Sequence, residues 1–386
     1  MDKTILVRYG EIGLKGKNRG FFERALVGNI SDTLRGLSVT KIAREHGRIF
    51  IKHRDETMEV VERLQRVFGI VSVSPTQLAS LDMADIENKA LEIMEDISPP
   101  ENATFKVIAR RSNKNFPLTS PEINREVGAH IFRNIEGLSV DVHNPDISLY
   151  IEIRKEQAYL YSDHHDAPGG LPVGVTGRGG LMISGGIDSP VAGWLAMKRG
   201  IEIVGIHFHS FPFTSERAKD KVVDLCGILA QYGGGFKLYI VHFTEIQREI
   251  KKNCPEELYI TIMRRMMFRI AERISTKEKC SALFTGENLA QVASQTLESM
   301  DVIEKVVELP VLRPLITMDK KEIIEKAQEI GTYETSILPY EDCCTLFVPK
   351  HPAIKPNLRR VLAAEEKLPQ GLLEDALDKT EVLQIT

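Results

Sequence analysis

The chain has 386 residues, of which 42% are hydrophobic and 27% charged, and its formal net charge is −4. This length exceeds one typical core and predicts two or three domains. No apolar run approaches the roughly 18 residues that a membrane-spanning helix needs. The N-terminus also lacks the apolar core of a secretory signal, so we expect a cytoplasmic protein without membrane association.

The cysteine spacing and the charge distribution narrow the possible classes of protein further. None of the five cysteines has CxxC spacing, which disfavours a disulfide scaffold and a structural zinc site. Residues 1–54 contain 12 Lys/Arg against 5 Asp/Glu, a net charge of +7, which leaves −11 for the rest of the chain. A basic N-terminal segment predicts a polyanionic partner, with ordinary solvated charge as the alternative.

The first 80 residues show a β-α-β-β-α-β pattern of hydrophobic periodicity. This order is typical of an α+β ferredoxin-like domain, whose open sheet often serves as a platform. The predicted elements are a strand at 4–10, a helix at 19–35, strands at 38–44 and 47–53, a helix at 58–68 and a strand at 70–80.

A second mixed segment follows and ends in a glycine-rich stretch. Residues 163–180, DHHDAPGGLPVGVTGRGG, contain two prolines and many glycines, which predicts a linker. The elements predicted before this linker are helices at 83–95 and 122–134 and strands at 104–111, 147–155 and 157–163.

Beyond the linker, buried-looking strands alternate with helical segments such as 215–233 and 256–274. Repeated βα units predict a doubly wound parallel sheet with helices on both faces, an α/β fold. The strands are expected at 181–184, 202–210, 236–243 and 281–286.

The sequence SGGIDSP, residues 184–190, lies between the first of these strands and a helix that begins near Ser189. Ligands of open parallel sheets bind at this position. Gly185 and Gly186 allow a close approach to an anion, and the helix N-terminus favours phosphate. The alternative is a simple turn in which Asp188 and Ser189 cap the helix. Because no lysine follows the glycines, a Walker loop that transfers a γ-phosphate is disfavoured.

SGGIDSP resembles the PP-loop signature SGGxDS of ATP pyrophosphatases, which activate a carbonyl oxygen by adenylation and release pyrophosphate. Four further blocks are similar to those of the tRNA 4-thiouridine synthetase family, which sulfurates uridine 8 of tRNA and is linked to thiazole synthesis for thiamine. They are YGEIGLKGKNR (9–19), GLPVGVTGRGG (170–180), TGENLAQVASQT (285–296) and YEDCCTLFVPKHP (340–352). The resemblance implies a ferredoxin-like domain at 1–58, an RNA-binding THUMP domain at 59–165 and a PP-loop domain at 166–386.

The resemblance also implies which residues contact ATP. Asp188 is expected to help hold Mg²⁺ or to orient the adenylation, because a carboxylate beside phosphates needs a bridging cation. The resemblance implies that Arg264 neutralises a phosphate of ATP, and the neighbouring Arg265 is the alternative for this role. The implied ATP contacts are Met182, Ile183, Ser184, Gly185, Gly186, Asp188, Ser189, His207, Phe208, Arg264, Gly286 and Gln295.

Two basic clusters are candidates for RNA binding. One lies in the block at 9–19, and the other in FKVIARRSNKNFP (105–117), which combines four cations with two phenylalanines and has no acid. Such a patch can neutralise phosphates, although a solvated strand edge would look the same. The candidate residues are Lys15, Lys17, Arg19, Lys106, Arg110, Arg111 and Lys114.

The sulfur source is the least determined part of the reaction. Some family members carry a persulfide on a C-terminal rhodanese domain, but no cysteine follows Cys344 here, so the resemblance is to the short form. We expect Cys344, or alternatively Cys343, to hold the sulfur beside Lys350 and His351, whose charges would lower a thiol pKa. An iron–sulfur cluster is a minor alternative.

The predicted function is therefore ATP-dependent transfer of sulfur to tRNA. Uridine O4 would be adenylated with release of pyrophosphate, and a persulfide sulfur would then displace AMP. The expected partners are tRNA, a cysteine desulfurase or other persulfide donor, a sulfur-carrier protein of thiamine synthesis, and a second copy in a homodimer. Two alternatives stay open: another PP-loop ATP-dependent ligase, and a tRNA-binding module with a degenerate nucleotide site.

Overall fold

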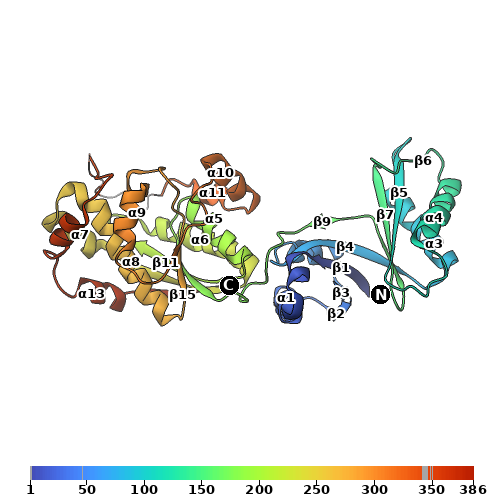
Figure 1. Ribbon diagram of the computed structural model, residues 1–386, viewed down its shortest axis with the longest axis horizontal. Helices are drawn as coiled ribbons and strands as arrows, with labels where there is room; N and C mark the ends of the chain where they lie inside the picture. The colour runs from blue at the N-terminus through green and yellow to red at the C-terminus, as the bar shows by residue number, and fades with distance from the viewer. Residues whose placement is uncertain (1, 46, 341–346, 348, 350) are drawn as a thin grey trace. The chain divides into compact units, whose positions relative to one another are not determined.

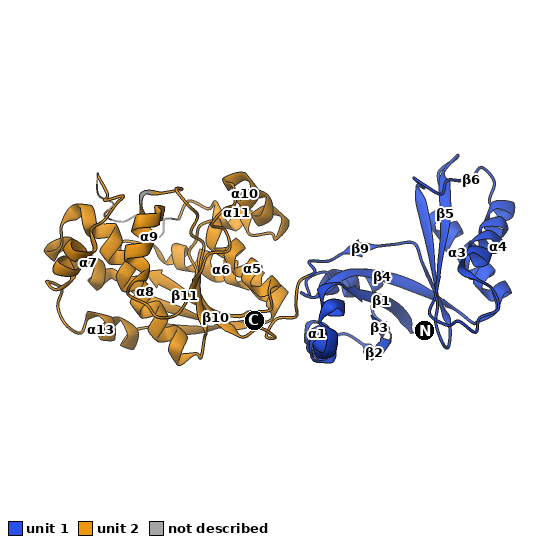
Figure 2. Ribbon diagram, in the orientation of Figure 1, with its two compact units in different colours: residues 1–169 blue, residues 170–386 orange. Residues whose placement is uncertain are grey.

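The computed structural model describes residues 2–45, 47–340, 347, 349 and 351–386, and the chain divides into two compact units. Unit 1 covers residues 1–169 and unit 2 covers residues 170–386 (Figure 2). The division between Gly169 and Gly170 falls inside the predicted linker. Among the described helices, none is both long and apolar enough to span a bilayer.

The N-terminal part of unit 1 has the predicted β-α-β-β-α-β order. Its strands pair antiparallel in the order β2-β3-β1-β4, which is the ferredoxin-like arrangement. The second helix ends at Leu64, four residues before the predicted end, and the chain turns back into the sheet at Ile70. The elements are β1 (Lys3–Tyr9), η1 (Glu11–Leu14), η2 (Gly16–Asn18), α1 (Arg19–Thr33), β2 (Val39–Glu45), β3 (Arg48–His53), α2 (Thr57–Leu64) and β4 (Ile70–Ala79).

The long strand β4 joins this sheet to a second one in the same unit. Its first part pairs with β1, and its last three residues pair with β8, so the strand order continues β4-β8-β7-β5-β6. Helices α3 and α4 lie together beside β5 and β7 (Figure 1). The remaining elements are α3 (Met83–Ile97), β5 (Thr104–Arg111), α4 (Ser120–Asn134), β6 (Ser139–Val140), β7 (Ile147–Ile153), β8 (Ala158–Tyr161) and β9 (His165–Asp166).

One face of the ferredoxin-like sheet carries Leu6 and Phe50. Strand β8 packs on this part of the face through Tyr159 and Tyr161. The rings of Phe50 and Tyr159 lie 4.2 Å apart between centroids, and Tyr161 joins the same buried cluster. This part of the face is therefore filled by the chain itself, so it is not available as a platform for another molecule.

Unit 2 contains a six-stranded sheet in the order β14-β13-β10-β11-β12-β15. All pairs are parallel except the edge strand β15, which runs antiparallel to β12 and was not predicted. The strands are β10 (Arg178–Met182), β11 (Glu202–His209), β12 (Phe236–His242), β13 (Ala282–Thr285), β14 (Val311–Leu312) and β15 (Glu381–Ile385). The doubly wound α/β prediction is confirmed, with one antiparallel strand added at the edge.

The first strand of unit 2 begins three residues earlier than predicted, inside the glycine-rich stretch. A Cβ atom on Gly180 would lie 2.0 Å from the Ser275 hydroxyl oxygen, and one on Gly179 would lie 2.5 Å from the Phe284 ring. These glycines let helix and strand pack closely on β10, and linker flexibility is not their role here.

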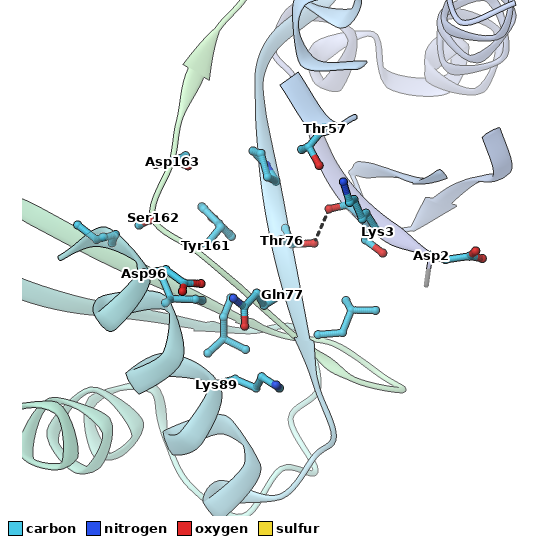
Figure 3. A pocket seen from close by; sticks show the side chains of 16 residues that line it. Asp2, Lys3, Thr57, Thr76, Gln77, Lys89, Asp96, Tyr161, Ser162 and Asp163 are labelled. Atoms are coloured by element: carbon cyan, nitrogen blue, oxygen red, sulfur yellow. Dashed lines mark hydrogen bonds between the residues drawn. The ribbon is translucent and has the colours of Figure 1, made fainter. Parts of the chain in front are cut away.

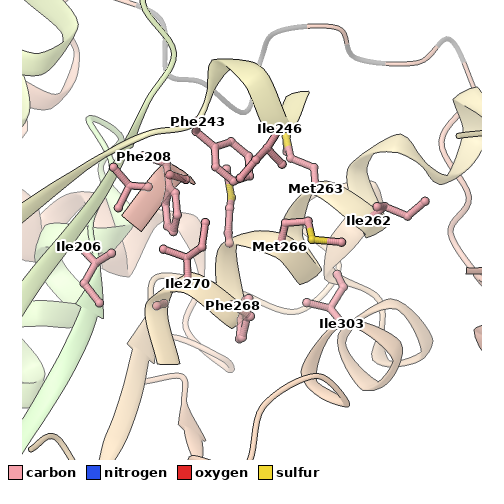
Figure 4. Packing of buried hydrophobic residues seen from close by; sticks show 14 of the residues in the cluster. Ile206, Phe208, Phe243, Ile246, Ile262, Met263, Met266, Phe268, Ile270 and Ile303 are labelled. Carbon is pink, nitrogen blue, oxygen red and sulfur yellow. The ribbon is translucent and has the colours of Figure 1, made fainter. Parts of the chain in front are cut away.

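Helix α8 packs on the sheet through the largest core cluster of unit 2 (Figure 4). Phe208 of β11 meets Phe243 edge to face at 5.2 Å, and Met263 and Phe268 of α8 are buried in the same cluster. Each such burial contributes about 1.5–3 kcal/mol, so α8 is held firmly over the sheet. The helices are α5 (Asp188–Lys198), α6 (Glu216–Gly233), α7 (Thr244–Asn253), η3 (Glu256–Leu258), α8 (Tyr259–Lys277), η4 (Ala293–Gln295), α9 (Leu297–Glu304), α10 (Lys320–Glu329), α11 (Tyr333–Ser336), α12 (Leu358–Glu365) and α13 (Leu372–Asp378).

Candidate active site

A pocket of about 180 Å³ lies where β10, β11 and β13 end, at the carboxyl edge of the parallel sheet. It brings together all of the predicted ATP contacts except Gly185, which is buried but does not line it. Three further residues that were not predicted also line it, namely Met267, Thr285 and Glu287. The lining residues that were predicted are Met182, Ile183, Ser184, Gly186, Asp188, Ser189, His207, Phe208, Arg264, Gly286 and Gln295.

The loop after β10 is closed by its own serines. The Ser189 hydroxyl accepts a hydrogen bond from the Ser184 backbone N–H at 2.8 Å, and the Ser184 hydroxyl accepts one from the Gly186 N–H at 3.3 Å. The N-cap of α5 is Ile187, and it makes no side-chain cap. Neither Asp188 nor Ser189 is the N-cap residue, and the N-cap makes no side-chain hydrogen bond, so this helix start is suited to an anion.

Gly286 lies directly against the start of α5. A Cβ atom at this position would be 2.6 Å from the Ser189 backbone nitrogen and 2.8 Å from the carbonyl carbon of Asp188. The end of β13 can therefore touch the backbone of the loop only because residue 286 has no side chain.

Asp188 is held between two side chains from distant segments. Its Oδ1 lies 2.6 Å from the Lys320 ammonium nitrogen, and its Oδ2 accepts from the Gln291 side-chain amide at 3.1 Å. Lys320 begins helix α10. The cation that is absent from the loop sequence is thus supplied by a segment more than a hundred residues away.

Glu287 is a buried carboxylate, 3% exposed, that pairs with two arginines. Its Oε1 lies 2.7 Å from an Arg264 guanidinium nitrogen, and its Oε2 accepts from Arg313 Nε at 2.8 Å and from the Thr285 hydroxyl at 3.0 Å. Burial alone would raise the pKa of Glu287, but the two arginines hold it below the ordinary value. Arg313 is fixed in turn by Glu304 at 2.8 Å.

Three polar atoms of the lining residues are buried without a hydrogen-bond partner among the described residues, although one of them, Glu287 Oε1, still forms the ion pair with Arg264. The other two are the acceptor Oε1 of Gln295, whose side chain is 8% exposed, and the donor Nε of Arg264. An unsatisfied buried polar group costs about 1–3 kcal/mol. One donor and one acceptor that line the same cavity are suited to a polar, anionic ligand.

The two histidines of β11 have different surroundings. His207 lines the pocket, and its Nδ1 lies 3.1 Å from the carbonyl oxygen of Ile183. His209 is buried beside Thr214 and Glu216, and burial lowers its pKa. Within the described part of the chain, no group of three or more His, Cys, Asp or Glu side chains is arranged to hold a metal ion.

The cysteines outside the predicted sulfur segment belong to the interior. Cys226 and Cys280 are buried, and burial raises the pKa of Cys280 to about 11. Cys254 is partly buried, and burial also raises its pKa. The predicted sulfur carriers Cys343 and Cys344 lie outside the described residues.

The seven predicted RNA-binding cations fall into two groups. Four of them already have partners in unit 1: Lys15 with Glu11 at 2.7 Å, Arg19 with Glu23 at 2.8 Å, Lys106 with the Val142 carbonyl at 2.7 Å and Arg111 with the Phe116 carbonyl at 2.9 Å. Lys17, Arg110 and Lys114 are exposed. The exposed three are the ones best able to reach phosphates.

A larger cavity, of about 850 Å³, lies in unit 1 between β4 and α3 (Figure 3). Its charged lining consists of Asp2, Asp96 and Asp163 with Lys3 and Lys89. A lining with more acids than bases and no glycine-rich loop is unsuited to polyphosphate. The smaller pocket of unit 2 is therefore the better candidate for a nucleotide site.

Three comparisons with protein families agree on the architecture. The model of "Thiamine biosynthesis protein (ThiI)" matches residues 174–369, the ThiI ferredoxin-like domain matches residues 4–74, and the THUMP domain matches residues 81–163.

Individual relatives match over nearly the whole chain. A probable tRNA sulfurtransferase of Moorella thermoacetica is 57% identical, with 100% of this chain and 98% of the relative covered. One of Halothermothrix orenii is 54% identical, with 100% and 99% covered. Among solved structures, a 4-thiouridine synthetase in complex with RNA and with bound ATP has a TM-score of 0.92 at 43% identity, with 100% of both chains covered. A Pyrococcus horikoshii protein has a TM-score of 0.69 at 29% identity, with 85% and 99% covered.

Proposed function

Because this chain belongs to the thiamine biosynthesis protein (ThiI) family, we propose that it is an ATP-dependent tRNA sulfurtransferase that makes 4-thiouridine at uridine 8. The observation that carries the proposal is the pocket of unit 2. There an uncapped helix N-terminus, a cation–carboxylate pair and an arginine meet around one cavity. The described relative with 100% coverage of both chains was solved with ATP and RNA together, which supports the same pair of substrates here.

The first step is adenylation of the base. Uridine O4 attacks the α-phosphorus, the bond to the bridging oxygen breaks, and pyrophosphate leaves with the electron pair. The proton on uridine N3 passes to solvent as O4 becomes the C4–O–AMP oxygen. The first turn of α5, Lys320 and Arg264 would stabilise the charge on the phosphates.

Gln295 and Phe208 would orient the nucleoside end of ATP. Phe208 offers an apolar ring and Gln295 an unsatisfied acceptor for an amino or hydroxyl hydrogen. These roles, like that of Gly185 in the loop, are part of the proposal.

A magnesium ion would fit beside Asp188. Mg²⁺ is commonly held by one or two carboxylates plus substrate phosphates and water, and Asp188 is a partly exposed carboxylate at the loop. When bound, the ion would neutralise phosphate charge. Lys320 already pairs with that carboxylate, so ammonium and metal would share it.

The second step needs sulfur from outside the described residues. The terminal sulfur of a persulfide on Cys344, or on Cys343, would attack C4, and AMP would leave with the oxygen and the electron pair of the C4–O bond. A second thiol would then attack the cysteine sulfur and form a disulfide with it, which breaks the S–S bond and leaves the terminal sulfur on the base. We propose a cysteine desulfurase as the donor, and transfer to a sulfur-carrier protein for thiamine synthesis as a second outlet.

The modular arrangement belongs to the same proposal. Residues 1–58 and 59–165 would hold tRNA, and residues 166–386 would carry out the chemistry, with a homodimer allowing one copy to present tRNA to the other. Sedimentation of the enzyme with tRNA at working concentration tests the dimer, and a purely monomeric complex would remove it.

The deciding experiment is loss of 4-thiouridine in a strain that carries only Asp188→Ala. We expect tRNA from this strain to lose its near-ultraviolet absorbance, because the carboxylate that holds a cation between the loop and the phosphates is removed. Unchanged absorbance would overturn the role of Asp188. In a separate experiment, the wild-type enzyme is incubated with a cysteine desulfurase, and mass spectrometry should find the persulfide on Cys344.

A further inference from the structure

We propose that Phe211 is a positioning residue that stacks on the uracil ring of the tRNA substrate beside the nucleotide pocket. This rests on the proposed function, since it assigns a place to the base that is adenylated. Nothing in the sequence motifs assigned a role to residues 210–214, SFPFT.

The loop at 210–214 lies beside the nucleotide pocket. Residues 210–214 follow β11, which neighbours β10 in the parallel sheet, so the loop lies at the same edge as the phosphate-binding loop. A short ladder of rings connects it to the pocket. His207 lines the pocket, His209 follows at 6.3 Å, and Phe211 stacks on His209 at 6.4 Å with the ring planes 19° apart.

Phe211 is unusually exposed for a phenylalanine. Its side chain is 53% exposed, although a phenylalanine of a folded domain is usually buried. The neighbouring Phe213 is 49% exposed, but its ring edge packs on Phe347 at 5.2 Å. Within the described residues, Phe211 makes a ring contact with His209, and its exposed surface can accept another planar ring.

Hydrogen bonds fix the conformation of the loop at 210–214. The Ser210 hydroxyl donates to Gln247 Oε1 at 2.5 Å, and the Thr214 N–H donates to the Ser210 carbonyl at 3.0 Å. The Thr244 hydroxyl donates to the Phe211 carbonyl at 2.7 Å. An exposed aromatic ring on a fixed loop loses little entropy when it binds a base.

The chemistry of the substrate requires a binding place for an unstacked base. Uridine O4 must reach the α-phosphate, so the base has to leave its stacked position in tRNA. Aromatic side chains replace the lost stacking in such sites, and nearby cations hold the flanking phosphates. Arg217 and Lys251 both follow the loop in the sequence and are exposed; Lys251 lies 4.0 Å from the centroid of Phe347, whereas the acid Glu216 faces His209.

The test compares ring shape with mere hydrophobicity. Phe211→Leu keeps an apolar side chain but no ring, and Phe211→Tyr keeps the ring. We expect Phe211→Leu to lower kcat/KM for tRNA roughly five- to 150-fold, the value of one base–aromatic stack, with KM for ATP unchanged. Phe211→Tyr should retain most of the activity, and Val382→Ala, an exposed apolar position on β15, should change nothing.

A second readout needs only the unmodified enzyme. The product base 4-thiouridine forms crosslinks under near-ultraviolet light, so irradiated complexes of enzyme and thiolated tRNA should yield a crosslinked peptide that contains residues 210–214. A crosslink confined to another segment, or equal kcat/KM for Phe211→Leu and the wild type, would overturn the proposal. If the wild type makes no 4-thiouridine from ATP, tRNA and a persulfide donor, the proposed function itself fails, which is a distinct outcome.

Discussion

Lys320 holds its ammonium nitrogen 2.6 Å from a carboxylate oxygen of Asp188, although 132 residues separate the two in the sequence. The pair places a positive charge at the start of α5, where the loop after β10 would receive phosphate. In a Walker loop the corresponding charge comes from a lysine beside the glycines. Here the fold supplies it through the N-terminus of α10.

Replacing Lys320 with methionine should slow pyrophosphate release by roughly 10²–10³-fold, because one charged donor to the phosphates is removed. Lys320→Arg should retain part of the activity. The matched control is Lys321→Met, whose side chain is 86% exposed and pairs only loosely with Glu325 at 3.7 Å. Pyrophosphate release measured with ATP, tRNA and each variant decides the matter, and a normal rate for Lys320→Met would contradict the assignment.

Gly286→Ala should weaken ATP binding and destabilise unit 2 by about 1–3 kcal/mol, because the new methyl group would collide with the backbone of Ser189. Gly227→Ala is the control. This position lies within α6 and a Cβ atom there meets nothing within 4 Å, so the free energy of unfolding should stay equal or rise by about 0.5–1 kcal/mol. Urea unfolding and nucleotide titration of both variants provide the comparison.

Glu287→Gln should lower the free energy of unfolding at neutral pH by about 3–5 kcal/mol, because Arg264 and Arg313 lose their buried counter-charge. The measurement is chemical unfolding, with Glu334→Gln on the surface of α11 as the control. ATP affinity should fall as well, since Arg264 loses the carboxylate that orients it.

The pH dependence of stability tests the same carboxylate. Its pKa in the folded protein is lowered from the ordinary 4.5, so its contribution is fully present above about pH 4.5 and is lost as the pH falls toward the lowered value. The wild type should therefore lose more stability than Glu287→Gln as the pH falls from 6 to the acid transition. If the free energy of unfolding fell equally with decreasing pH in the two proteins, Glu287 would not be charged in the folded state.

Arg110 and Lys114 should contribute to tRNA binding through phosphates. The double variant Arg110→Gln/Lys114→Gln should reduce the slope of log K against log salt by about 2, since each lost phosphate contact removes about 1. Arg35→Gln removes an arginine of the same unit that is already paired with Asp32 at 2.6 Å, and it should leave the slope unchanged. A slope unaffected by the double variant would place the RNA elsewhere.

The fold class was readable from the sequence because its signals are local. Alternating apolar residues in segments such as 47–53 define strands wherever they occur, and the βα repeats after residue 180 require a parallel sheet. The glycines and serines of 184–189 likewise carry their conformational freedom and hydrogen-bonding capacity with them. The ferredoxin-like order and the position of the loop at the end of a strand followed from these signals.

The partners of those residues were decided only by the tertiary structure. Glu287 and Gln291 stand inside the quoted block at 285–296, but no local pattern shows that one is paired with Arg313 and the other with Asp188. Lys320 carries no signal at all. Ion pairs depend on distances between elements that are far apart in the chain, and hydrophobic periodicity does not contain those distances.

The glycines and serines near the loop after β10 show the same division between what the sequence and what the tertiary structure decide. The sequence by itself predicted a close backbone approach at Gly185 and Gly186, where side chains are absent, and a linker for the glycines up to Gly180. Only the packed structure decided what approaches: the Ser275 hydroxyl at Gly180, and the Ser189 hydroxyl that closes the loop at Ser184. Side-chain absence is a local property, whereas the neighbour that fills the space is chosen by the packing of α8 and α5 on the sheet.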